Sequence, residues 1–257
     1  MKNKVVFITG AAGGIGFEIG KQFAEKGATV IISDINDQKV FAAANILKNQ
    51  DLEVTGIGCD VTNEEQLIAV IAGIYKDYGR IDVVVNNAGL QYVSPIEDFP
   101  TDKFKMLITV MLIAPFITIK NTFPIMKKQR FGRIINVASI NGLIGFPGKA
   151  AYNSAKHGVI GLTKVAALEG AGYGITVNAI CPGYVDTDLV RNQLTDIAEL
   201  KNISVHKVLE DVLYPLIPQK RLLTVEEIAS YTLYLASDKA SGITGQAVVI
   251  DGGYTVQ

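Results

Sequence analysis

The stretch VVFITGAAGGIG, residues 5–16, decides the fold of this chain. An apolar run typical of a buried strand passes directly into a glycine-rich turn, and a helical pattern begins at Gly14. In such a turn Gly10 allows a sharp bend, Gly14 lets the backbone approach a ligand, and Gly16 lets helix and strand pack closely. Exposed N–H groups and the positive end of the helix dipole then favour phosphate groups. Taken alone, a glycine-rich run also fits a plain strand-to-helix connection.

Strand-like and helix-like segments alternate from this stretch to the end of the chain. The predicted strands are Val5–Thr9, Thr29–Ser33, Val54–Cys59, Ile81–Asn86, Arg133–Ser139, Ile175–Cys181 and Gln246–Ile250. The predicted helices are Gly14–Lys26, Asp37–Lys48, Glu64–Tyr78, Thr101–Lys127, Ala150–Gly170 and Val225–Ala236. Most strand-like runs are continuously apolar, which is typical of parallel strands covered by helices on both faces. The sequence therefore predicts one doubly wound, Rossmann-like α/β domain over residues 1–257, with a seven-stranded parallel sheet.

One long segment, Leu189–Leu223, interrupts this alternation. It is predicted to be an inserted helical piece over the carboxyl edge of the sheet, where open α/β folds bind their ligands. We expect this segment to close over the bound substrate as a lid.

Composition argues against several classes of protein. The chain has 257 residues, 49% of them hydrophobic and 19% charged, which is enough apolar material for a sizeable core. Its formal net charge of -1 shows no excess of basic residues that would suggest binding to nucleic acid or to an anionic membrane. We expect no membrane-spanning segment, because no apolar run approaches the roughly 20 residues that one requires. Two separated cysteines, Cys59 and Cys181, form no disulfide framework, so a cytoplasmic protein is expected.

The second predicted strand is followed by Asp34, close to the roughly 20-residue offset at which dinucleotide-binding folds place an acidic residue. A carboxylate there accepts hydrogen bonds from both hydroxyls of the adenosine ribose. It also repels a 2′-phosphate, so Asp34 favours NAD over NADP. The alternative is a cap for the helix that begins near Asp37.

Three further loops follow predicted strands and bring polar groups to the same edge of the sheet. They are Cys59-Asp60-Val61, Asn86-Asn87-Ala88-Gly89 and Cys181-Pro182-Gly183-Tyr184-Val185-Asp186-Thr187. Asp60 would hold the adenine edge, small residues would admit the cofactor to the second loop, and Thr187 would bind the nicotinamide amide. Each loop alone is an ordinary turn, but together they predict a dinucleotide site.

The sequence Tyr152-Asn153-Ser154-Ala155-Lys156 opens the helix after the fifth strand. Residues four apart share a helix face, so the Tyr152 hydroxyl and the Lys156 ammonium are expected to lie close together. A phenol has a pKa of about 10, and we expect the cation to lower it so that Tyr152 can act as a base. Ser139 would hydrogen-bond the reacting oxygen. An exposed helix pair is the alternative for Tyr-x-x-x-Lys without this context.

As a set, these residues resemble the short-chain dehydrogenase/reductase family over the whole chain, from Thr9 to Asp251-Gly252-Gly253. The resemblance implies a Rossmann-like fold without a separate substrate domain, no catalytic metal, and usually a homotetramer. It implies that Ser139, Tyr152 and Lys156 are catalytic and that Lys156 also binds the nicotinamide ribose. The implied cofactor-binding residues are Thr9, Gly10, Gly14, Ile15, Gly16, Asp34, Asp60, Val61, Asn87, Ala88, Gly89, Tyr152, Lys156, Pro182, Gly183, Val185 and Thr187.

One position departs from the family pattern. The family usually has an asparagine in the helix after the fourth strand, where it helps to hold a proton relay, and Met111 stands there in this chain. A thioether is a weak acceptor at best. We therefore leave Met111 out of the catalytic set and expect it to fill the core.

Other segments resemble the bacterial D-3-hydroxybutyrate dehydrogenases, a group within that family. The resemblance implies that Gln91, Lys149 and Gln193 hold the substrate carboxylate. Lys149 lies three residues before Tyr152, so its ammonium can reach the same pocket and form a charge-assisted hydrogen bond. Ser139, Tyr152 and Asn141 complete the expected substrate site, with Asn141 where that group often has a histidine. No role is assigned to the two histidines, His157 and His206.

The expected activity is therefore reversible, NAD-dependent oxidation of D-3-hydroxybutyrate to acetoacetate, acting on a small hydroxy or keto acid. Surface positions for Lys149 and the two glutamines are the structural alternative. Two other functions stay open. One is another dehydrogenase of this family, acting on a 3-oxoacyl thioester, a sugar or a polyol. The other is a non-catalytic NAD-binding regulator, which the presence of both Tyr152 and Lys156 disfavours.

Overall fold

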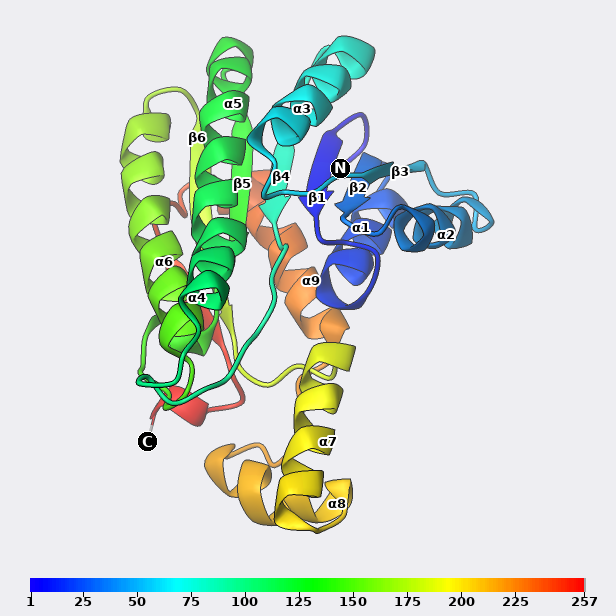
Figure 1. Ribbon diagram of the computed structural model, residues 1–257. Helices are drawn as coiled ribbons and strands as arrows, with labels where there is room; N and C mark the ends of the chain where they lie inside the picture. Colours follow the sequence, from blue (N-terminus) through cyan, green and yellow to red (C-terminus); the bar gives the residue numbers. More distant parts are fainter. Residues whose placement is uncertain (257) are drawn as a thin grey trace.

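Seven parallel strands form the centre of the computed structural model (Figure 1), which describes residues 1–256, with the side chains of residues 196, 197 and 199–201 excepted. Their spatial order is β3-β2-β1-β4-β5-β6-β7. The strands are β1 (Val5–Thr9), β2 (Thr29–Asp34), β3 (Val54–Gly58), β4 (Val83–Asn86), β5 (Gly132–Val137), β6 (Ile175–Pro182) and β7 (Ala247–Ile250). The order reverses between β1 and β4, as in a doubly wound sheet. The predicted single-domain, Rossmann-like fold is confirmed.

Helices cover both faces of this sheet, which explains why its central strands are largely apolar. The longer helices are α1 (Gly14–Glu25), α2 (Asp37–Lys48), α3 (Glu64–Tyr78), α4 (Thr101–Ile108), α5 (Ala114–Gln129), α6 (Ala150–Ala171), α7 (Asp188–Lys201) and α9 (Val225–Leu235). Every residue of β1, β4, β5 and β6 is buried. Strands buried on both faces lack the polar alternation of half-exposed strands.

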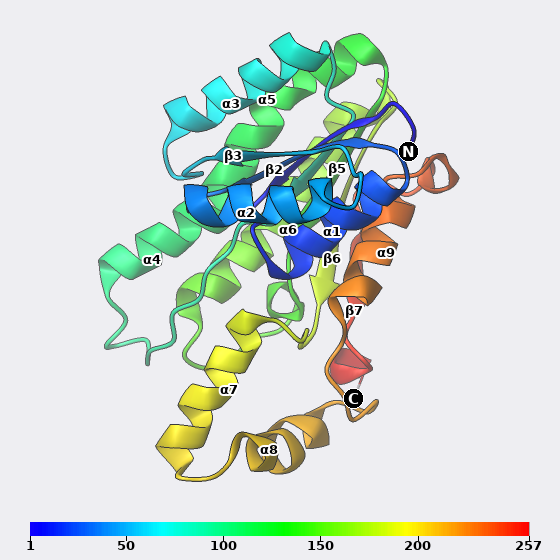
Figure 2. The ribbon, with the colours of Figure 1, turned by 90° about the vertical axis from the view of Figure 1, so that its right-hand side faces the viewer.

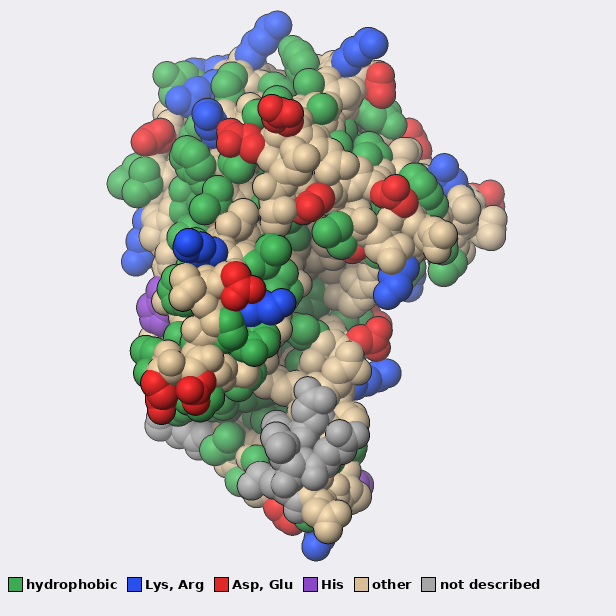
Figure 3. Space-filling view, in the orientation of Figure 1, with side chains coloured by type: hydrophobic (Ala, Val, Ile, Leu, Met, Phe, Trp, Pro, Cys, Tyr) green, Lys and Arg blue, Asp and Glu red, His purple; other side chains and the backbone are tan. Residues whose placement is uncertain are grey.

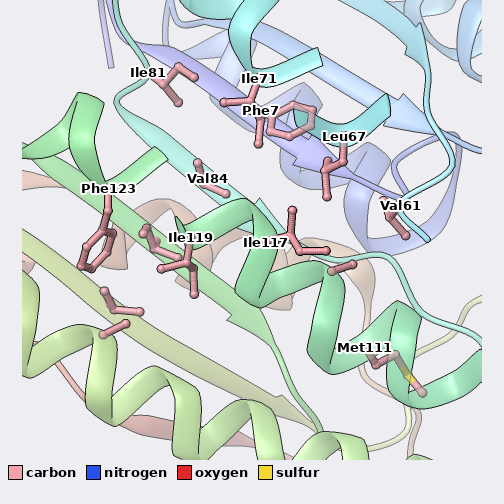
Figure 4. Packing of buried hydrophobic residues seen from close by; sticks show 14 of the residues in the cluster. Phe7, Val61, Leu67, Ile71, Ile81, Val84, Met111, Ile117, Ile119 and Phe123 are labelled. Atoms are coloured by element: carbon pink, nitrogen blue, oxygen red, sulfur yellow. The ribbon is translucent and has the colours of Figure 1, made fainter. Parts of the chain in front are cut away.

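Successive residues of β1 belong to two different hydrophobic cores. Val6 and Ile8 pack with Phe23 of α1, in a cluster that also contains residues of α2 and α9. Phe7 points to the opposite face, where it packs with Leu67 of α3 (Figure 4). This alternation follows from the two-residue period of a strand. The two cores fix β1, and therefore the glycine turn that follows it.

A long apolar helix runs across the second core. It consists of α4, a π-helical turn at Thr109–Ile113 and α5, and thus extends two residues beyond the predicted end at Lys127. By length and hydropathy (1.7) the helix Thr101–Gln129 could cross a membrane, although no such segment was expected from the sequence. More than half of its most apolar window is buried against the fold, so the apolar residues here serve the core. Met111, in the π-helical turn, belongs to that core.

The inserted segment is helical, and it projects beyond the carboxyl edge of the sheet (Figures 1 and 2). It contains α7, the short helix α8 (Val205–Val208), a π-helical turn at Leu209–Leu213 and a 3-10 turn at Tyr214–Leu216. A separate hydrophobic cluster holds it together, including Leu194 of α7 and Val208 of α8. The segment therefore has its own small core apart from the two cores of the sheet.

The end of β5 differs from the prediction. The strand ends at Val137, and Ser139 lies two residues later, with extended backbone. Its hydroxyl accepts a hydrogen bond from the Asn141 N–H at 3.1 Å and so caps the 3-10 turn Ile140–Gly142. Ser139 is therefore set by a capping interaction beyond the strand.

Candidate active site

A cavity of about 790 Å³ opens at the carboxyl ends of the strands, where the strand order reverses. In Figure 3 the surface recedes between the body of the sheet and the projecting helical segment. Predicted site residues from every part of the chain line this cavity. They are Gly10, Gly14, Ile15, Asp34, Asp60, Val61, Asn87, Ala88, Gly89, Gln91, Ser139, Asn141, Lys149, Tyr152, Lys156, Pro182, Gly183, Val185, Thr187 and Gln193. The fold thus brings together residues that are widely separated in the sequence.

The glycine turn is shaped so that its backbone faces the cavity. Gly10 and Gly14 have positive φ angles of 62° and 55°, which side chains other than glycine rarely adopt. A Cβ atom on Gly10 would lie 2.6 Å from the Cα of Ala88 in the neighbouring loop. The turn therefore requires glycine for its conformation and for its contact with the β4 loop.

Thr9 and Gly16, two of the predicted cofactor residues, do not line the cavity. The Thr9 hydroxyl accepts hydrogen bonds from the N–H groups of Asn87 at 3.1 Å and Ala88 at 3.2 Å. A Cβ atom on Gly16 would lie 2.5 Å from the Asn87 amide nitrogen. Both residues fix the loop after β4 against the glycine turn, and they support the cavity wall from behind.

Asp34 lies at the end of β2 with its carboxylate held by the backbone. It accepts hydrogen bonds from the N–H groups of Ala12 at 3.3 Å and Asn36 at 3.2 Å. The cap of α2 is Asn36, whose side chain accepts from the Lys39 N–H at 2.9 Å. Capping therefore falls to Asn36, while Asp34 lines the cavity.

Asp60 is held in a comparable way after β3. Its carboxylate accepts hydrogen bonds from the backbone N–H of Thr62 at 2.9 Å and from the Thr62 hydroxyl at 2.7 Å. On the opposite side of the cavity, Thr187 stands just before α7, with its hydroxyl 3.5 Å from the Val190 N–H that donates to it. Its methyl carbon is 3.6 Å from the position of a Cβ on Gly14. Thr187 therefore contacts the glycine turn across the cavity.

Tyr152, Lys156 and Ser139 converge at the inner end of the cavity. Tyr152 and Lys156 come from the first two turns of α6, and the Lys156 Nζ atom lies 5.5 Å from the centroid of the Tyr152 ring. The Lys156 ammonium donates a hydrogen bond to the carbonyl of Val137 at 2.6 Å. Ser139 is hydrogen-bonded to Tyr152. The helical spacing brings Tyr152 and Lys156 together, and the capped turn after β5 places Ser139 beside them.

The protonation of this cluster is governed by burial. Burial raises the pKa of Tyr152, and the hydrogen bond with Ser139 lowers it by less. Burial also lowers the pKa of Lys156 to about 8, against a smaller opposing effect of Cys181. We expected the Lys156 cation to lower the pKa of Tyr152, but desolvation of the phenolate is the dominant effect in the protein without cofactor.

Lys149 is buried in the same cavity, with 4% of its surface exposed. Its Nζ atom lies 4.5 Å from the centroid of the Phe146 ring and 5.9 Å from that of Tyr152. Burial lowers the pKa of its ammonium to about 8, and no carboxylate of the described residues pairs with it. A buried cation without a counter-ion is costly, so this position favours an anionic ligand.

The backbone before Lys149 is fixed by the loop that carries Gln91. The carbonyl of Gly148 accepts a hydrogen bond from the Ser94 N–H at 2.9 Å. Gly148 has a φ angle of 77°, and a Cβ there would lie 3.0 Å from a methyl of Val93. The two loops are therefore joined, so the places of Gln91 and Lys149 depend on each other.

Three amide side chains complete this end of the cavity. Gln91, Asn141 and Gln193 line it, and within the part of the chain that the structure describes their amides have no hydrogen-bond partner. Amide groups that face a cavity unpaired are available to a polar ligand. Gln193 comes from α7, so the inserted segment supplies one of them.

Met111 and the histidines lie outside this arrangement. Met111 is 1% exposed and packs in the core of the α3–α5–α6 face. The ring of His157 is hydrogen-bonded to the Asn153 carbonyl at 2.9 Å on the exposed side of α6, and His206 lies on α8. Neither histidine lines the cavity.

The sequence analysis missed several lining residues, among them the charged residues Glu18, Asp186, Asp188 and Arg191. The Arg191 guanidinium forms two hydrogen bonds with the Asp186 carboxylate, Nε to Oδ1 at 2.7 Å and Nη2 to Oδ2 at 3.0 Å. Opposite charges five residues apart at the start of a helix were the available signal. The apolar residues Met106, Val110 and Leu90 also line the cavity, and nothing in their spacing distinguishes them from core residues.

Comparison with known proteins agrees with this geometry. A family model described as enoyl-(acyl carrier protein) reductase matches residues 10–255. The chain belongs to the short-chain dehydrogenase/reductase family. Within this family, the uncharacterized oxidoreductase YxjF of Bacillus subtilis (strain 168) is 62% identical over 257 residues, which is 100% of both chains.

Two further members of the family carry more informative names. The D-beta-hydroxybutyrate dehydrogenase of Rhizobium meliloti (strain 1021) is 42% identical over 262 residues, covering 99% of each chain. The crystal structure of an NAD⁺-bound xylitol dehydrogenase has a TM-score of 0.92 and 32% identity, covering 98% of this chain and 99% of that one. The chain is therefore an oxidoreductase of a family that uses NAD or NADP.

Proposed function

We propose that this protein catalyses the reversible, NAD-dependent oxidation of D-3-hydroxybutyrate to acetoacetate. One observation carries the proposal. The buried Lys149 ammonium has no carboxylate partner among the described residues and lies in the same cavity as Tyr152. The substrate that suits this arrangement has an alcohol and a carboxylate a few bonds apart. Similarity to the Rhizobium meliloti dehydrogenase supports the choice of acid and of stereochemistry.

The cofactor proposal depends on the other end of the cavity. The glycine turn offers backbone N–H groups at the cavity, and the space beside Gly13 is open, with no atom within 4 Å of where a Cβ would lie. This suits a dinucleotide diphosphate. Asp34 places a carboxylate at the end of β2, where it suits the two free ribose hydroxyls of NAD and repels the 2′-phosphate of NADP. Lys156 would hold the nicotinamide ribose, and Thr187 the nicotinamide amide.

In the proposed reaction the substrate hydroxyl lies between Ser139 and Tyr152. Ser139 hydrogen-bonds the reacting oxygen, and Tyr152 removes the hydroxyl proton as the carbonyl forms. Bound NAD supplies the acceptor for the hydride that leaves C3, and its positive charge favours the Tyr152 phenolate. In the reverse direction Tyr152 returns the proton to the same oxygen.

The substrate carboxylate is held by the proposed trio of Lys149, Gln91 and Gln193. The ammonium provides a charge-assisted hydrogen bond, and the amides can donate without adding an opposing charge. Because Gln193 lies on α7, closure of the inserted segment as a lid would complete this trio and exclude water.

Replacement of Lys149 by methionine tests this proposal. We expect kcat/KM for D-3-hydroxybutyrate to fall by about 10- to 100-fold, because a charge-assisted hydrogen bond to the carboxylate is lost. The inhibition constant of butyrate should rise by a similar factor, while that of butyramide, its neutral analogue, should stay within about twofold. Steady-state kinetics with both inhibitors measure the difference.

Lys149→Arg is the matched control, since it retains the charge in a different shape and should keep part of the butyrate affinity. If Lys149→Met weakened butyrate and butyramide equally, Lys149 would contribute packing and the substrate would need no carboxylate. A substrate panel of 3-oxoacyl thioesters, sugars and polyols would then decide among the remaining activities.

A further inference from the structure

The ion pair between Asp186 and Arg191 lies at the mouth of the cavity. A contribution to the stability of the fold does not explain it. Both side chains line the cavity, and 43% and 63% of their respective surfaces are exposed. An ion pair in this environment contributes little to folding. The two-pronged contact, at 2.7 and 3.0 Å, nevertheless holds the guanidinium in one defined orientation.

This pair lies across the boundary between the sheet and the inserted segment. The Asp186 N–H donates a hydrogen bond to the carbonyl of Leu223 at 2.8 Å, beside the bridge between Val185 and Leu223. Asp186 is therefore fixed to the body of the protein. Arg191 lies on the first turns of α7, two residues before Gln193. Any exchange of the partner of Arg191 would therefore act on the segment that carries Gln193.

The backbone of Arg191 is connected to the glycine turn through Thr187. Its N–H donates to the carbonyl of Thr187 at 2.9 Å, and the methyl of Thr187 faces Gly14 at the start of α1. The first turn of α1 contains no basic residue. The described residues that line the cavity include three cations, Lys149, Lys156 and Arg191. The first two lie at the inner end with Tyr152, which leaves Arg191 as the cation beside the turn.

We propose that Arg191 binds the diphosphate of the dinucleotide cofactor and that Asp186 competes for the same guanidinium when the cofactor is absent. The planar guanidinium can form two parallel hydrogen bonds with phosphate oxygens as readily as with a carboxylate. The diphosphate carries two negative charges against one on Asp186. Transfer of Arg191 to the cofactor would draw α7 toward the glycine turn.

This role rests on the proposed function, because it requires a dinucleotide cofactor, and it adds an order of binding. The cofactor would bind first and draw α7, which lines the cavity, toward the glycine turn. Gln193, on the same helix, would then be in place for the substrate carboxylate. Arg191 is thus a cofactor-binding residue whose movement also positions a substrate residue.

The test measures the affinity of ADP-ribose, which contains the diphosphate and needs no turnover, by isothermal titration calorimetry. Arg191→Gln should lower the affinity for ADP-ribose about tenfold, because a charge-assisted contact is lost. Asp186→Asn should raise the affinity for ADP-ribose several-fold, because the competing carboxylate is removed. Opposite signs from the two members of one ion pair are the result that the proposal requires.

The matched control is Arg221→Gln. Arg221 forms a similar two-pronged pair with Glu227, at 2.8 and 2.6 Å, but does not line the cavity. It should leave ADP-ribose affinity within twofold. If Arg191→Gln and Asp186→Asn both lowered the affinity for ADP-ribose, or if neither changed it, the ion pair would have only a structural role. The proposal would then be wrong. If the unmodified protein failed to bind ADP-ribose, the cofactor proposal itself would fail.

Discussion

Two buried lysines at the inner end of the cavity have different surroundings. Lys156 donates a hydrogen bond to the Val137 carbonyl at 2.6 Å, whereas Lys149 faces the rings of Phe146 and Tyr152 and has no protein carboxylate among the described residues. Burial lowers the pKa of each to about 8. A bound carboxylate would restore the lost solvation of Lys149 and raise its pKa. Binding of a carboxylate and protonation of Lys149 are therefore expected to depend on each other.

This coupling predicts a pH dependence of binding. Lys149 is protonated below a pH of about 8, so the inhibition constant of butyrate should be flat there. At higher pH the free enzyme loses the proton, and the inhibition constant should rise by up to about tenfold per pH unit. In Lys149→Arg the guanidinium stays charged, so the rise should disappear. The same rise in both proteins would assign the titration to Lys156 or Tyr152.

The relative positions of single residues could be predicted from the sequence where spacing alone determines them. The four-residue spacing brings Tyr152 and Lys156 together because both lie on α6. Spacing does not tell whether burial or a neighbouring cation dominates a pKa, so the raised pKa of Tyr152 was not predicted. The spacing of Asp186 and Arg191 allowed an ion pair but did not show that the two side chains line the cavity.

The loops before α4 and α6 behave as one unit through Gly148. Its positive φ of 77° and its closeness to a Val93 methyl make a side chain at this position both strained and crowded. We expect Gly148→Ala to destabilise the protein by about 1 kcal/mol, the cost of a left-handed conformation. It should also raise KM for D-3-hydroxybutyrate several-fold, because the backbone leading to Lys149 shifts. Urea unfolding and steady-state kinetics measure the two effects.

Gly145→Ala is the control for this prediction. Gly145 has no positive φ, and a Cβ there would meet open space. This variant should change neither stability nor KM appreciably. A Gly148→Ala protein with an unchanged KM would show that the loop does not position Lys149.

At the level of helices and strands, periodicity predicted the elements well. All seven strands were expected within two residues of their observed bounds, because buried parallel strands are continuously apolar. The π-helical turn at Thr109–Ile113 was missed, because the sequence there is almost continuously apolar and does not distinguish one type of helical turn from another. The position of Ser139 was missed for a similar reason, because its capping bond leaves no trace in hydrophobicity.

The outer surface of the molecule carries apolar side chains on the helices that cover one face of the sheet. Ile113 and Phe116 are 44% and 49% exposed, and Val165 and Leu168 of α6 are 54% and 82% exposed. We propose that these residues form contacts in a homotetramer. Light scattering should give four times the mass of the chain, and Leu168→Glu should lower that value. Ile46→Glu, at an exposed position on α2, is the control and should not. A monomeric unmodified protein at micromolar concentration would contradict the proposal.

The whole molecule combines a cavity that suits a dinucleotide with a buried cation beside the tyrosine, and we propose that it oxidises a short hydroxy acid. The most direct test follows the NADH absorbance band after D-3-hydroxybutyrate is mixed with the protein and NAD. We predict turnover with NAD, much less with NADP, and a loss of about 100-fold or more in kcat for Tyr152→Phe. If no NADH formed while NAD binding was intact, or if Tyr152→Phe kept full activity, the account would be contradicted.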